Sequence, residues 1–321
     1  MNVTRLTLLS AIFAVASGGS HAAFPDRPIR IIVPYVPGGN IDITARTIAP
    51  GMSEALGVQV VIDNRGGAGG TIGTEIAAKA APDGYTLLLG STGTLATAPA
   101  LYPKVGFDPI KDFAMSSLVS VVPLVLDVHP SMPVKTVRDF IALAKTRPGR
   151  ITMSSSGTGT TNHLTGELFQ SVTGTKFIHV PYKGSGPALV DLMGGQVDLL
   201  FDQLPASIGF IQSGKLHAVA VTTLKRATTL PSVPTLDESG LKGFDASTTT
   251  GIMMPAATPP DVAAKVHAAV LKSLRQTSTR ENFARIGADV LESSPEEFTR
   301  TLRAEIAKWT KVIRDANIKM E

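Results

Sequence analysis

Two loops of this sequence concentrate groups that hold anions. The first is PYVPGGNID, where Gly38 and Gly39 separate an apolar run from a stretch with helical spacing. A helix that begins there directs free N–H groups and the positive end of its dipole at the turn. The second is SSSGTGTTN (residues 154–162), where hydroxyls and glycines again precede a helical pattern. Either loop alone is equally compatible with a plain helix-capping turn, whereas the two together predict one ligand held between them.

Neither loop has the signature of a nucleotide site. No G-x-G-x-x-G occurs in them, and no lysine follows the glycines as a P-loop requires. A small anion therefore fits these loops better than a phosphate nucleotide. If the backbone of the second loop donates to that anion, replacing Gly159 with proline removes a donor and weakens binding.

Two carboxylates, Asp42 and Asp202, are predicted beside the same anion. Asp42 falls in the first turn of the helix after Gly39, where negative charge is favourable near the positive end of the helix dipole. A polar contact from Asp42 to the ligand, or to a water bound with it, is an equally good interpretation of the sequence.

The sequence gives little support for a catalytic site or a metal site. Five histidines follow residue 22, and none has the H-x-x-x-H or H-E-x-x-H spacing of a metal site. No G-x-S-x-G elbow is present, and the chain has no cysteine for thiolate chemistry or disulfides. We therefore expect no catalytic residue, no metal and no cofactor. His163 is interpreted as a packing residue first and a ligand contact second, and a triad of Ser155, His163 and an aspartate stays open.

The elements that must position these loops alternate between strand and helix. Short apolar runs bounded by Gly, Pro or Asn predict strands, and amphipathic stretches predict helices. The predicted strands cover 30–33, 58–62, 85–89, 151–155, 177–181, 197–201, 216–221 and 248–255. The predicted helices cover 41–56, 71–80, 136–145, 161–172, 188–193, 259–276 and 295–315. This alternation predicts parallel βαβ units, whose ligands bind beyond the carboxyl ends of the strands.

Loops at the other strand ends join the predicted site for the same reason. These loops contain Ser91 with Thr92, Asn64 with GGAGG (66–70), Tyr182 with Lys183, and Asp202 with Gln203.

The segment LVSVVPLVLDVH predicts a crossing between two lobes. It is too long for one buried strand of a single unit, and Pro123 interrupts it. A strand that leaves one lobe and continues in the next has this pattern, and residues 241–254 are the candidate return crossing. The predicted ranges are 24–123 and 248–321 for lobe I and 124–247 for lobe II. Two crossings form a hinge, and the alternative is one continuous α/β domain.

Residues 1–22 are predicted to be an export signal. Arg5 precedes the apolar run LTLLSAIFAVA, and Ser20-His21-Ala22 offers small residues for cleavage after Ala22. The run is shorter than a membrane-spanning helix requires. The chain is 43% hydrophobic and 17% charged, and its formal net charge of +4 is not clustered. This composition indicates a large core and no nucleic-acid partner, and we expect an exported monomer.

Taken together, the motifs resemble one family, the Bug receptors of tripartite tricarboxylate transporters. The matching segments are FPDRPIRIIVPYVPGGNIDITAR, VIDNRGGAGGTIG, APDGYTLLLG, LYPKVGFDPIKDF, SSSGTGTTNHL, VPYKGSGPALVDLMGGQVDLLFDQLP and LPSVPTLDESGLKGF. The resemblance covers essentially the whole mature chain, and the motifs are specific as a set although weak singly. One departure is Gly66, where the family often has proline, which implies a looser turn without a change of function.

The resemblance implies a type II periplasmic-binding-protein fold, with two α/β lobes of mostly parallel sheet, flanking helices and two hinge crossings. It implies that the lobes close on a small organic acid whose carboxylate sits on backbone groups and waters of the two loops. The matching loop residues are Pro37, Gly38, Gly39, Asn40, Asp42, Ser154, Ser155, Gly157, Thr158, Gly159, Thr160, Thr161 and Asn162. Further contacts map onto Tyr35, Ser91, Thr92, Tyr182 and Asp202. Lys183 either contacts a second carboxylate or points to solvent.

The resemblance also implies a docking partner in the periplasm, namely membrane transporter subunits that receive the closed form. Two other functions stay open: a ligand sensor for a two-component system and, with less support, an exported α/β hydrolase. The acid itself is not predicted, because acidic amino acids, dicarboxylates, citrate-like acids and aromatic acids all fit.

Overall fold

The structure is a computed structural model that describes residues 24–102 and 104–318. The predicted signal at 1–22 lies outside these residues. The first elements are β1 (Ile29–Val33), α1 (Asn40–Leu56), β2 (Val60–Asn64), η1 (Ala68–Gly70), α2 (Thr71–Ala78) and β3 (Thr86–Ser91). The strand β1 lies between β2 and β3 in parallel, with Ile31 opposite Ile62 and Leu87. The predicted alternation of strand and helix is confirmed here.

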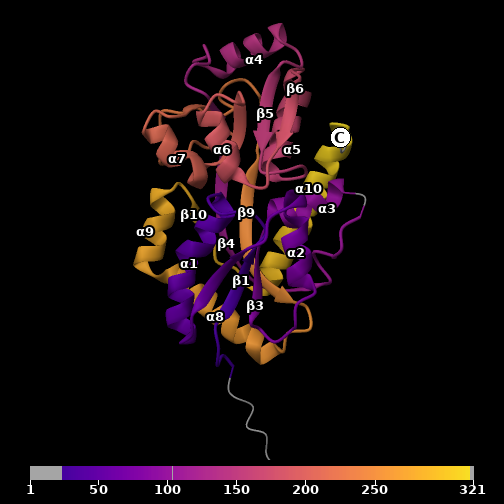
Figure 1. Cartoon of the computed structure of the whole chain (residues 1–321), viewed down its shortest axis with the longest axis vertical. Helices are drawn as coiled ribbons and strands as arrows, with labels where there is room; N and C mark the ends of the chain where they lie inside the picture. The colour runs from indigo at the N-terminus through magenta and orange to yellow at the C-terminus, as the bar shows by residue number, and fades with distance from the viewer. Residues whose placement is uncertain (1–23, 103, 319–321) are drawn as a thin grey trace, which may run out of the picture.

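A second set of elements repeats this arrangement (Figure 1). It consists of α4 (Val137–Thr146), β5 (Ile151–Ser155), α5 (Thr161–Thr173), β6 (Phe177–Pro181), α6 (Ser185–Met193), β7 (Leu199–Gln203), α7 (Leu204–Gln212) and β8 (His217–Val221). The strand β5 lies between β6 and β7 in parallel. A capping box begins α4, where Thr136 and Asp139 bond each other's backbone N–H groups.

One long strand, β4 (Phe113–Val128), runs through both sheets. Its first part pairs antiparallel with β9 (Ser247–Pro255) as far as Pro123, opposite Ser247. From Leu124 onward it pairs instead with β7 and β8. The long apolar segment is therefore a single strand shared by two sheets. Proline is tolerated at 123 because the strand changes partners there.

Two crossings link the sheets, as predicted. One is β4, and the other is the segment that enters β9. We call the part built around β1–β3 lobe I and the part built around β5–β7 lobe II. The precise boundaries at 124 and 248 stay a prediction. Thr222 joins the two crossings, because its Oγ1 accepts from the Leu124 N–H at 3.0 Å and donates to the Ala246 carbonyl at 2.7 Å.

The C-terminal helices return to lobe I (Figure 1). After β9 come α8 (Pro260–Arg275), α9 (Thr277–Arg285), β10 (Asp289–Val290) and α10 (Pro295–Asp315). The helix α8 packs on α1, where Ser273 Oγ donates to the Ile48 carbonyl at 2.7 Å. The strand β10 pairs with β4, and α10 also packs on β4. Lobe I is therefore assembled from both ends of the chain.

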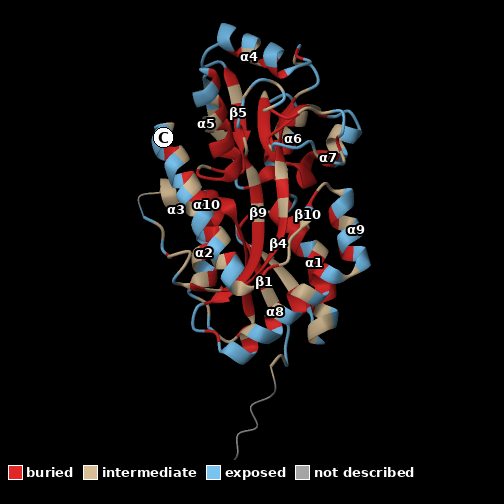
Figure 2. Ribbon diagram, turned by 180° about the vertical axis from the view of Figure 1, so that it is seen from behind, coloured by how far each residue is buried: buried red, intermediate tan, exposed pale blue. Residues whose placement is uncertain are grey.

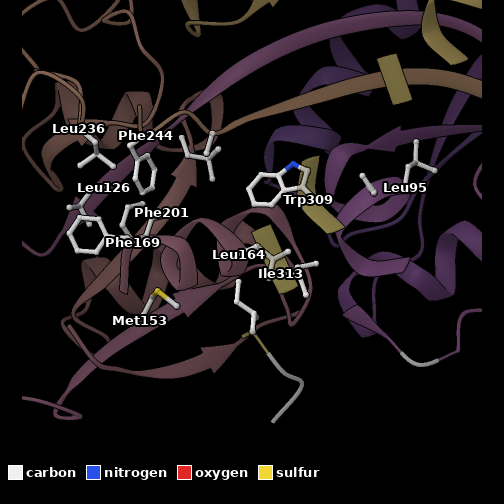
Figure 3. Close-up of a cluster of buried hydrophobic side chains, with 14 of the residues drawn as sticks. Leu95, Leu126, Met153, Leu164, Phe169, Phe201, Leu236, Phe244, Trp309 and Ile313 are labelled. Carbon is white, nitrogen blue, oxygen red and sulfur yellow. The ribbon is translucent and has the colours of Figure 1, made fainter. Parts of the chain in front are cut away.

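Buried residues run along the sheets through both lobes, and the exposed residues gather on the helices (Figure 2). In lobe II, Phe169 packs against Phe140 and Phe201, with ring centroids 5.8 and 5.4 Å apart. Figure 3 shows Trp309 of α10 between this cluster and Leu95 of lobe I. The apolar core is thus continuous between the lobes, beside the hinge.

Several elements differ from the sequence prediction. The helix expected at 188–193 begins earlier, at Ser185, and the strand expected at 58–62 begins at Val60. The helix α7 was not predicted, because its sequence LPASIGFIQ is apolar around most of its circumference and its first half is buried. A helix without a polar face gives no 3.6-residue periodicity. The short elements η1, η2 (Gly93–Thr97), α3 (Ala98–Leu101), α9 and β10 were also not predicted.

Candidate ligand-binding site between the lobes

The two lobes meet over a small cavity lined by uncharged residues. Lobe I supplies Tyr35, Gly39, Asn40, Ile41 and Ser91, and lobe II supplies Ser156, Thr161, Ser185 and Gln203. The volume open to the centre of a water-sized sphere is about 10 Å³, roughly the space of one water molecule. The lobes are therefore closed on each other in this conformation.

Three helices begin at this cavity. Asn40 and Ile41 open α1, Thr161 opens α5, and Ser185 opens α6. The first N–H groups of a helix have no acceptor within the helix, and the helix dipole is positive at that end. The three starts follow parallel strands, so they gather at the carboxyl ends of the two sheets. This arrangement surrounds one point with donors and positive potential, which suits an anion.

Asn40 brings a further donor to the cavity. Its side chain is buried, its Oδ1 accepts from Thr44 Oγ1 at 3.4 Å, and its Nδ2 has no hydrogen-bond partner among the described residues. Leaving a buried donor unsatisfied costs roughly 1–3 kcal/mol. An acceptor atom of a ligand in the cavity would remove that cost.

Asp42 organises the first loop from inside lobe I. Its Oδ2 accepts from the Gly38 N–H at 3.1 Å, and its Oδ1 accepts from Asn64 Nδ2 at 3.0 Å. Arg46, one helical turn later, completes the set with an ion pair at 3.0 Å. Burial raises the pKa of Asp42, but the hydrogen bonds from these three partners outweigh it and leave the pKa below its usual range. Asp42 is therefore ionised, and its oxygens are already occupied by the loop that it shapes.

The second loop is held by side chains of lobe II. Ser155 Oγ accepts from the Gly157 N–H at 3.1 Å and lies 2.7 Å from His179 Nε2. The Gly159 N–H donates to His163 Nδ1 at 3.2 Å. In this conformation the Gly159 N–H faces back into lobe II, so its expected contact with a ligand stays a prediction. Gly159 also has φ +78°, which proline cannot adopt, so the proline variant would disrupt the loop itself.

His163 and His179 form a neutral stacked pair under this loop. Their ring centroids are 4.0 Å apart, with planes at 18°. Burial lowers the pKa of His163 to about 3, with His179 adding to the shift, and burial lowers the pKa of His179 to about 4. A neutral His163 keeps Nδ1 free to accept the Gly159 N–H, so the histidines support the loop. This matches the packing role placed first for His163.

Asn162 is the centre of a buried amide network. Its Nδ2 donates to the Phe201 carbonyl at 2.8 Å and to Asp202 Oδ1 at 3.0 Å. Its Oδ1 accepts from Ser156 Oγ at 2.8 Å and from Gln203 Nε2 at 3.1 Å. Asn162 thereby fixes two side chains that line the cavity, Ser156 and Gln203.

Hydrogen bonds from lobe I to backbone carbonyls of lobe II hold the lobes together across the cleft. The Val36 N–H donates to the Lys183 carbonyl at 3.3 Å, and Tyr102 Oη donates to the Thr158 carbonyl at 3.1 Å. Gly69 comes so close that a Cβ on it would lie 2.2 Å from the Thr158 oxygen. The closed arrangement thus depends on a glycine in the GGAGG loop.

A larger groove lies elsewhere, on the outer side of lobe II. Its volume is about 980 Å³, and it is lined by residues 130–135 and 230–234 with parts of α7 and β8. It is formed by lobe II alone, and the carboxyl ends of β5, β6 and β7 do not contribute to it. The interlobe cavity is therefore the better candidate for a ligand site.

Comparison with known proteins assigns the chain to a family. Residues 44–318 match the family described as "Tripartite tricarboxylate transporter family receptor". The chain belongs to this receptor family. Protein BugT of Bordetella pertussis is 38% identical to this receptor over 326 residues, with all of both chains covered. The predicted resemblance to Bug receptors is confirmed.

Solved structures show the fold of this receptor. The periplasmic binding protein BugD matches it with a TM-score of 0.90 and 37% identity, covering 93% of this chain and 100% of BugD. An R. palustris protein with adipate matches with a TM-score of 0.90 and 38% identity, covering 92% of this chain and 99% of that protein. MatC from Rhodopseudomonas palustris with bound malate matches with a TM-score of 0.88 and 33% identity, covering 90% of this chain and 100% of MatC. The predicted two-lobed periplasmic-binding-protein fold is confirmed.

The predicted contact residues of this receptor divide into two groups. Five line the closed cavity: Tyr35, Gly39, Asn40, Ser91 and Thr161. The others lie around it: Pro37, Gly38, Asp42, Thr92, Ser154, Ser155, Gly157, Thr158, Gly159, Thr160, Asn162, Tyr182 and Asp202. No ligand contact is tested by this placement, so the set stays a prediction.

Three of the surrounding side chains have partners within their own part of the molecule. Tyr182 Oη donates to Asp191 Oδ2, and the Tyr182 ring packs against α6. Burial and the Asp191 carboxylate raise the pKa of Tyr182 to about 12. Thr92 Oγ1 accepts from the Thr249 N–H at 3.1 Å. Ser154 Oγ donates to the Leu199 carbonyl at 3.2 Å. Lys183 is exposed, which agrees with the solvent interpretation.

Four lining residues were not predicted as contacts: Ile41, Ser156, Ser185 and Gln203. Ser156 and Ile41 lie inside the loops already singled out, so treating each loop as a unit would have included them. Ser185 follows Gly184, the N-cap of α6, and became visible only because α6 starts three residues before its expected position.

Two further searches concern the described residues only. Within 24–102 and 104–318, no helix is both long and apolar enough to cross a bilayer. In the same ranges, no group of three or more His, Asp or Glu side chains is arranged to hold a metal ion.

Proposed function

We propose that this receptor captures a small organic carboxylate in the cavity between its lobes, for delivery to membrane transporter subunits. The observation that carries the proposal is the convergence of three helix N-termini and the free Asn40 amide on one cavity between two hinged lobes. A carboxylate is the common small anion that matches such neutral donors. The adipate and malate bound by the two related structures support this ligand class.

The charge of the cavity is consistent with a carboxylate rather than a phosphate. None of the described residues that line it is a lysine or an arginine, so the negative charge is balanced by oriented dipoles and hydrogen bonds. Arg46 is near the first loop, but its guanidinium is paired with Asp42. This supports the predicted binding mode, in which backbone groups and waters of the two loops hold the carboxylate.

Capture requires the lobes to open and close. A cavity of about 10 Å³ holds about one water and does not admit an acid of four or more carbons. We propose that β4 and the segment before β9 bend to open the cleft, and that the acid then contacts both lobes. Such an acid favours the closed form only by its extra affinity for that form over the open one.

Transport and the absence of catalysis are both part of this proposal. The triad left open for Ser155 and His163 is not supported by their contacts, because Ser155 Oγ lies 2.7 Å from His179 Nε2 and His163 Nδ1 accepts the Gly159 N–H. The export signal predicted at 1–22 supports a periplasmic site of action. A monomer remains the expected state. A sensor role is the second candidate, since a sensor would use the same cavity and closure.

The test is a thermal-shift screen of residues 23–321 against malate, succinate, adipate, citrate, glutamate and nicotinate, followed by calorimetry. A bound acid stabilises the folded state by roughly 2.7 kcal/mol at a hundredfold excess over its dissociation constant. A shift by one acid, recovered chemically unchanged, supports the receptor. Turnover of an ester or amide, with no acid bound, would overturn it.

A matched pair of variants ties binding to the cavity. Asn40→Ala removes the free amide donor, and we expect affinity for the identified acid to fall by about tenfold, equal to about 1.4 kcal/mol. Asn282→Ala, on α9 and away from the cavity, is the control. Deleting the gene separates the two biological roles, because uptake of the acid stops for a transport receptor and continues for a sensor.

A further inference from the structure

Two buried carboxyl side chains, Asp127 and Asp202, lie close together behind the cavity. Both are 0% exposed. Asp202 of β7 is opposite Val125 of β4, so Asp127, two residues along β4, is on the same face of the sheet and diagonal to Asp202. Within the described ranges, no lysine or arginine is hydrogen-bonded or ion-paired to either one. The pair therefore has no counter-ion.

Hydrogen bonding does not replace a counter-ion here. Asp202 Oδ1 accepts from Ser185 Oγ at 2.6 Å and from Asn162 Nδ2 at 3.0 Å. Among the described residues, Oδ2 of Asp202 and both oxygens of Asp127 have no hydrogen-bond partner. The Ser207 hydroxyl near Asp127 opposes the rise of its pKa without preventing it. A buried ionised carboxylate without a partner is so costly that the group binds a proton instead. The pair therefore holds at least one proton.

The two acids differ in how readily they ionise. Burial raises the pKa of Asp127 well above its usual range, and the neighbouring Asp202 adds to the shift. Burial also raises the pKa of Asp202, to about 7, against hydrogen bonds from Ser185, the Gln203 backbone and Asn162. Asp127 is thus the member that is held neutral more strongly, and Asp202 is the member that changes charge near neutral pH.

The surroundings of Asp202 contain few other ionisable groups. The helices α5 and α6 face it with the neutral Asn162 and Ser185, and β4 presents Asp127. On α5, His163 is turned to Gly159 and His179, where it stays neutral. On β8, His217 lines the outer groove. α7 and β5 contribute Ser207 and Ser154.

The proton on Asp202 controls a hydroxyl that lines the ligand cavity. Ser185 has one hydroxyl hydrogen, and an ionised Asp202 takes it across the 2.6 Å contact. Ser185 then presents only lone pairs to the cavity and to Ser156 Oγ, 2.9 Å away. A protonated Asp202 can donate to Ser185 Oγ across the same contact. That reversal frees the Ser185 hydrogen for an anion in the cavity.

We propose that Asp202 is a positioning residue for ligand capture, so that an anionic carboxylate enters the cavity together with one proton taken up by Asp202. The proton moves from solvent to the Asp202 carboxylate, and the Ser185 hydroxyl turns from Asp202 to the ligand carboxylate. No covalent bond to the ligand forms or breaks. This inference rests on the proposed function and adds to it the protonation state in which the site accepts its acid.

The first experiment needs no ligand. Asp side chains of the protein are labelled with ¹³C at the carboxyl carbon and titrated by NMR, and the signals are assigned by their loss in Asp127→Asn and Asp202→Asn. We expect one carboxyl signal to titrate near neutral pH and another to stay protonated throughout. Ordinary titration of both near pH 4 would overturn the inference, whether or not any acid binds.

The second experiment counts protons on binding. Malate and adipate are titrated into the wild-type protein by calorimetry at pH 5.5 and pH 8, in buffers of different ionisation enthalpy. We expect close to one proton taken up at pH 8 and close to none at pH 5.5. Above neutral pH the dissociation constant should rise by up to about tenfold per pH unit, because binding then requires the uptake of a proton. Binding at pH 8 without proton uptake would overturn the coupling.

Variants separate positioning from structure. Asp202→Asn carries an amide that donates at any pH, so we expect proton uptake to vanish and affinity to vary less than about twofold between pH 6 and 8.5. Asp198→Asn is the matched control, because Asp198 belongs to the same segment of lobe II and bonds Thr152 away from the cavity. It should retain the wild-type pH dependence. Equal proton uptake in Asp202→Asn and wild type would overturn the assignment.

The outcomes distinguish this inference from the proposed function. If neither malate, adipate nor any other acid of the screen binds, the proposed function fails, while the ligand-free titration still decides whether the proton site exists. If acids bind and the carboxyl pair is ionised at pH 6, the receptor stands and the proton coupling fails. The wild-type measurements decide both points even if a variant does not fold.

Discussion

In lobe I the parallel strands lie in the order β2-β1-β3, and in lobe II they lie in the order β6-β5-β7, each with a crossing strand antiparallel beside the third. Both lobes place a carboxylate next to the cavity. In lobe I, Asp42 has a guanidinium and two amide donors and stays ionised. In lobe II, Asp202 has no cation and shares its environment with a second acid. The same topology therefore supports pKa shifts of opposite direction, and the local partners decide which one occurs.

The largest effect is expected from Gly69→Ala, at the contact between the lobes. Gly69 has φ +62°, and a Cβ there would lie 2.2 Å from the Thr158 carbonyl oxygen, which is backbone and cannot move aside easily. We expect the closed form to be blocked and affinity for the identified acid to fall at least about 100-fold, equal to about 2.7 kcal/mol. Calorimetry measures this.

The control for that variant is Gly57→Ala at the end of α1. Gly57 has a similar φ of +70° but nothing within 4 Å of the added Cβ, so it isolates backbone strain from the clash. We expect it to lower stability slightly and to leave affinity within about twofold. A similar loss of affinity in both variants would show that strain, not lobe contact, explains Gly69.

A second effect is expected at the hinge that joins the two lobes. Thr222→Val removes the hydroxyl that connects the Leu124 N–H to the Ala246 carbonyl, in a fully buried position. Leaving those groups unpaired should lower the free energy of unfolding by roughly 1–3 kcal/mol. Urea unfolding measures this, with the exposed Thr228→Val as control. Equal stability of both variants would contradict a role for Thr222 in linking the lobes.

The pH dependence of stability should have opposite signs for the two acids. The pKa of Asp42 is lowered by folding, so its contribution is present above about pH 4 and is lost as pH falls through the folded-state value. The pKa of Asp202 is raised to about 7, so its contribution is full below about pH 4 and is lost as pH rises to about 7.

Melting temperatures of the two asparagine variants, measured from pH 2.5 to pH 8, test these signs. Relative to wild type, Asp42→Asn should lose stability as pH rises toward about 4, and Asp202→Asn should gain stability as pH rises from about 4 to about 7. The loss at Asp42 should be about 1 kcal/mol, because Arg46 is 55% exposed and solvent screens the pair. Parallel curves for both variants would remove the contrast between the lobes.

The smallest effect is expected from Lys183→Ala. Its carbonyl accepts the Val36 N–H across the cleft, but its side chain is exposed and no described residue is paired with it. The backbone contact survives the substitution, so affinity for a dicarboxylate should stay within about twofold. A tenfold loss by calorimetry would instead show that Lys183 closes over a second carboxylate.

The sequence allowed much of the fold to be predicted, because its signals are local. Apolar runs of four to six residues ended by Gly, Pro or Asn identified β1, β3, β5 and β6, and an amphipathic stretch identified α4. The change of lobes was visible because Pro123 interrupts an apolar segment of unusual length. The helix α7 was not predicted, because its sequence has no polar face and therefore no 3.6-residue hydrophobic periodicity.

The candidate site was predictable only in part, because the sequence shows local signals and not contacts between distant segments. Both anion loops were found, since glycines and hydroxyls before a helix are local signals. Their individual atoms were not: the Gly159 N–H was expected at the ligand and instead bonds His163. Ser185 enters the cavity through the first turn of α6, and no nearby residue in the sequence marks it as a partner of Asp202.

By itself, the sequence determined the family, the alternating strands and helices and the two glycine-rich loops, because these depend on residues near one another along the chain. Only the tertiary structure decided which side chains meet at the cavity and which charge each acid carries. Arg46 reaches Asp42 within one helical turn, whereas Asp127 and Asp202 are 75 positions apart and meet through strand pairing. Burial and counter-ions are properties of the folded surroundings, and they set the ionisation of a carboxylate.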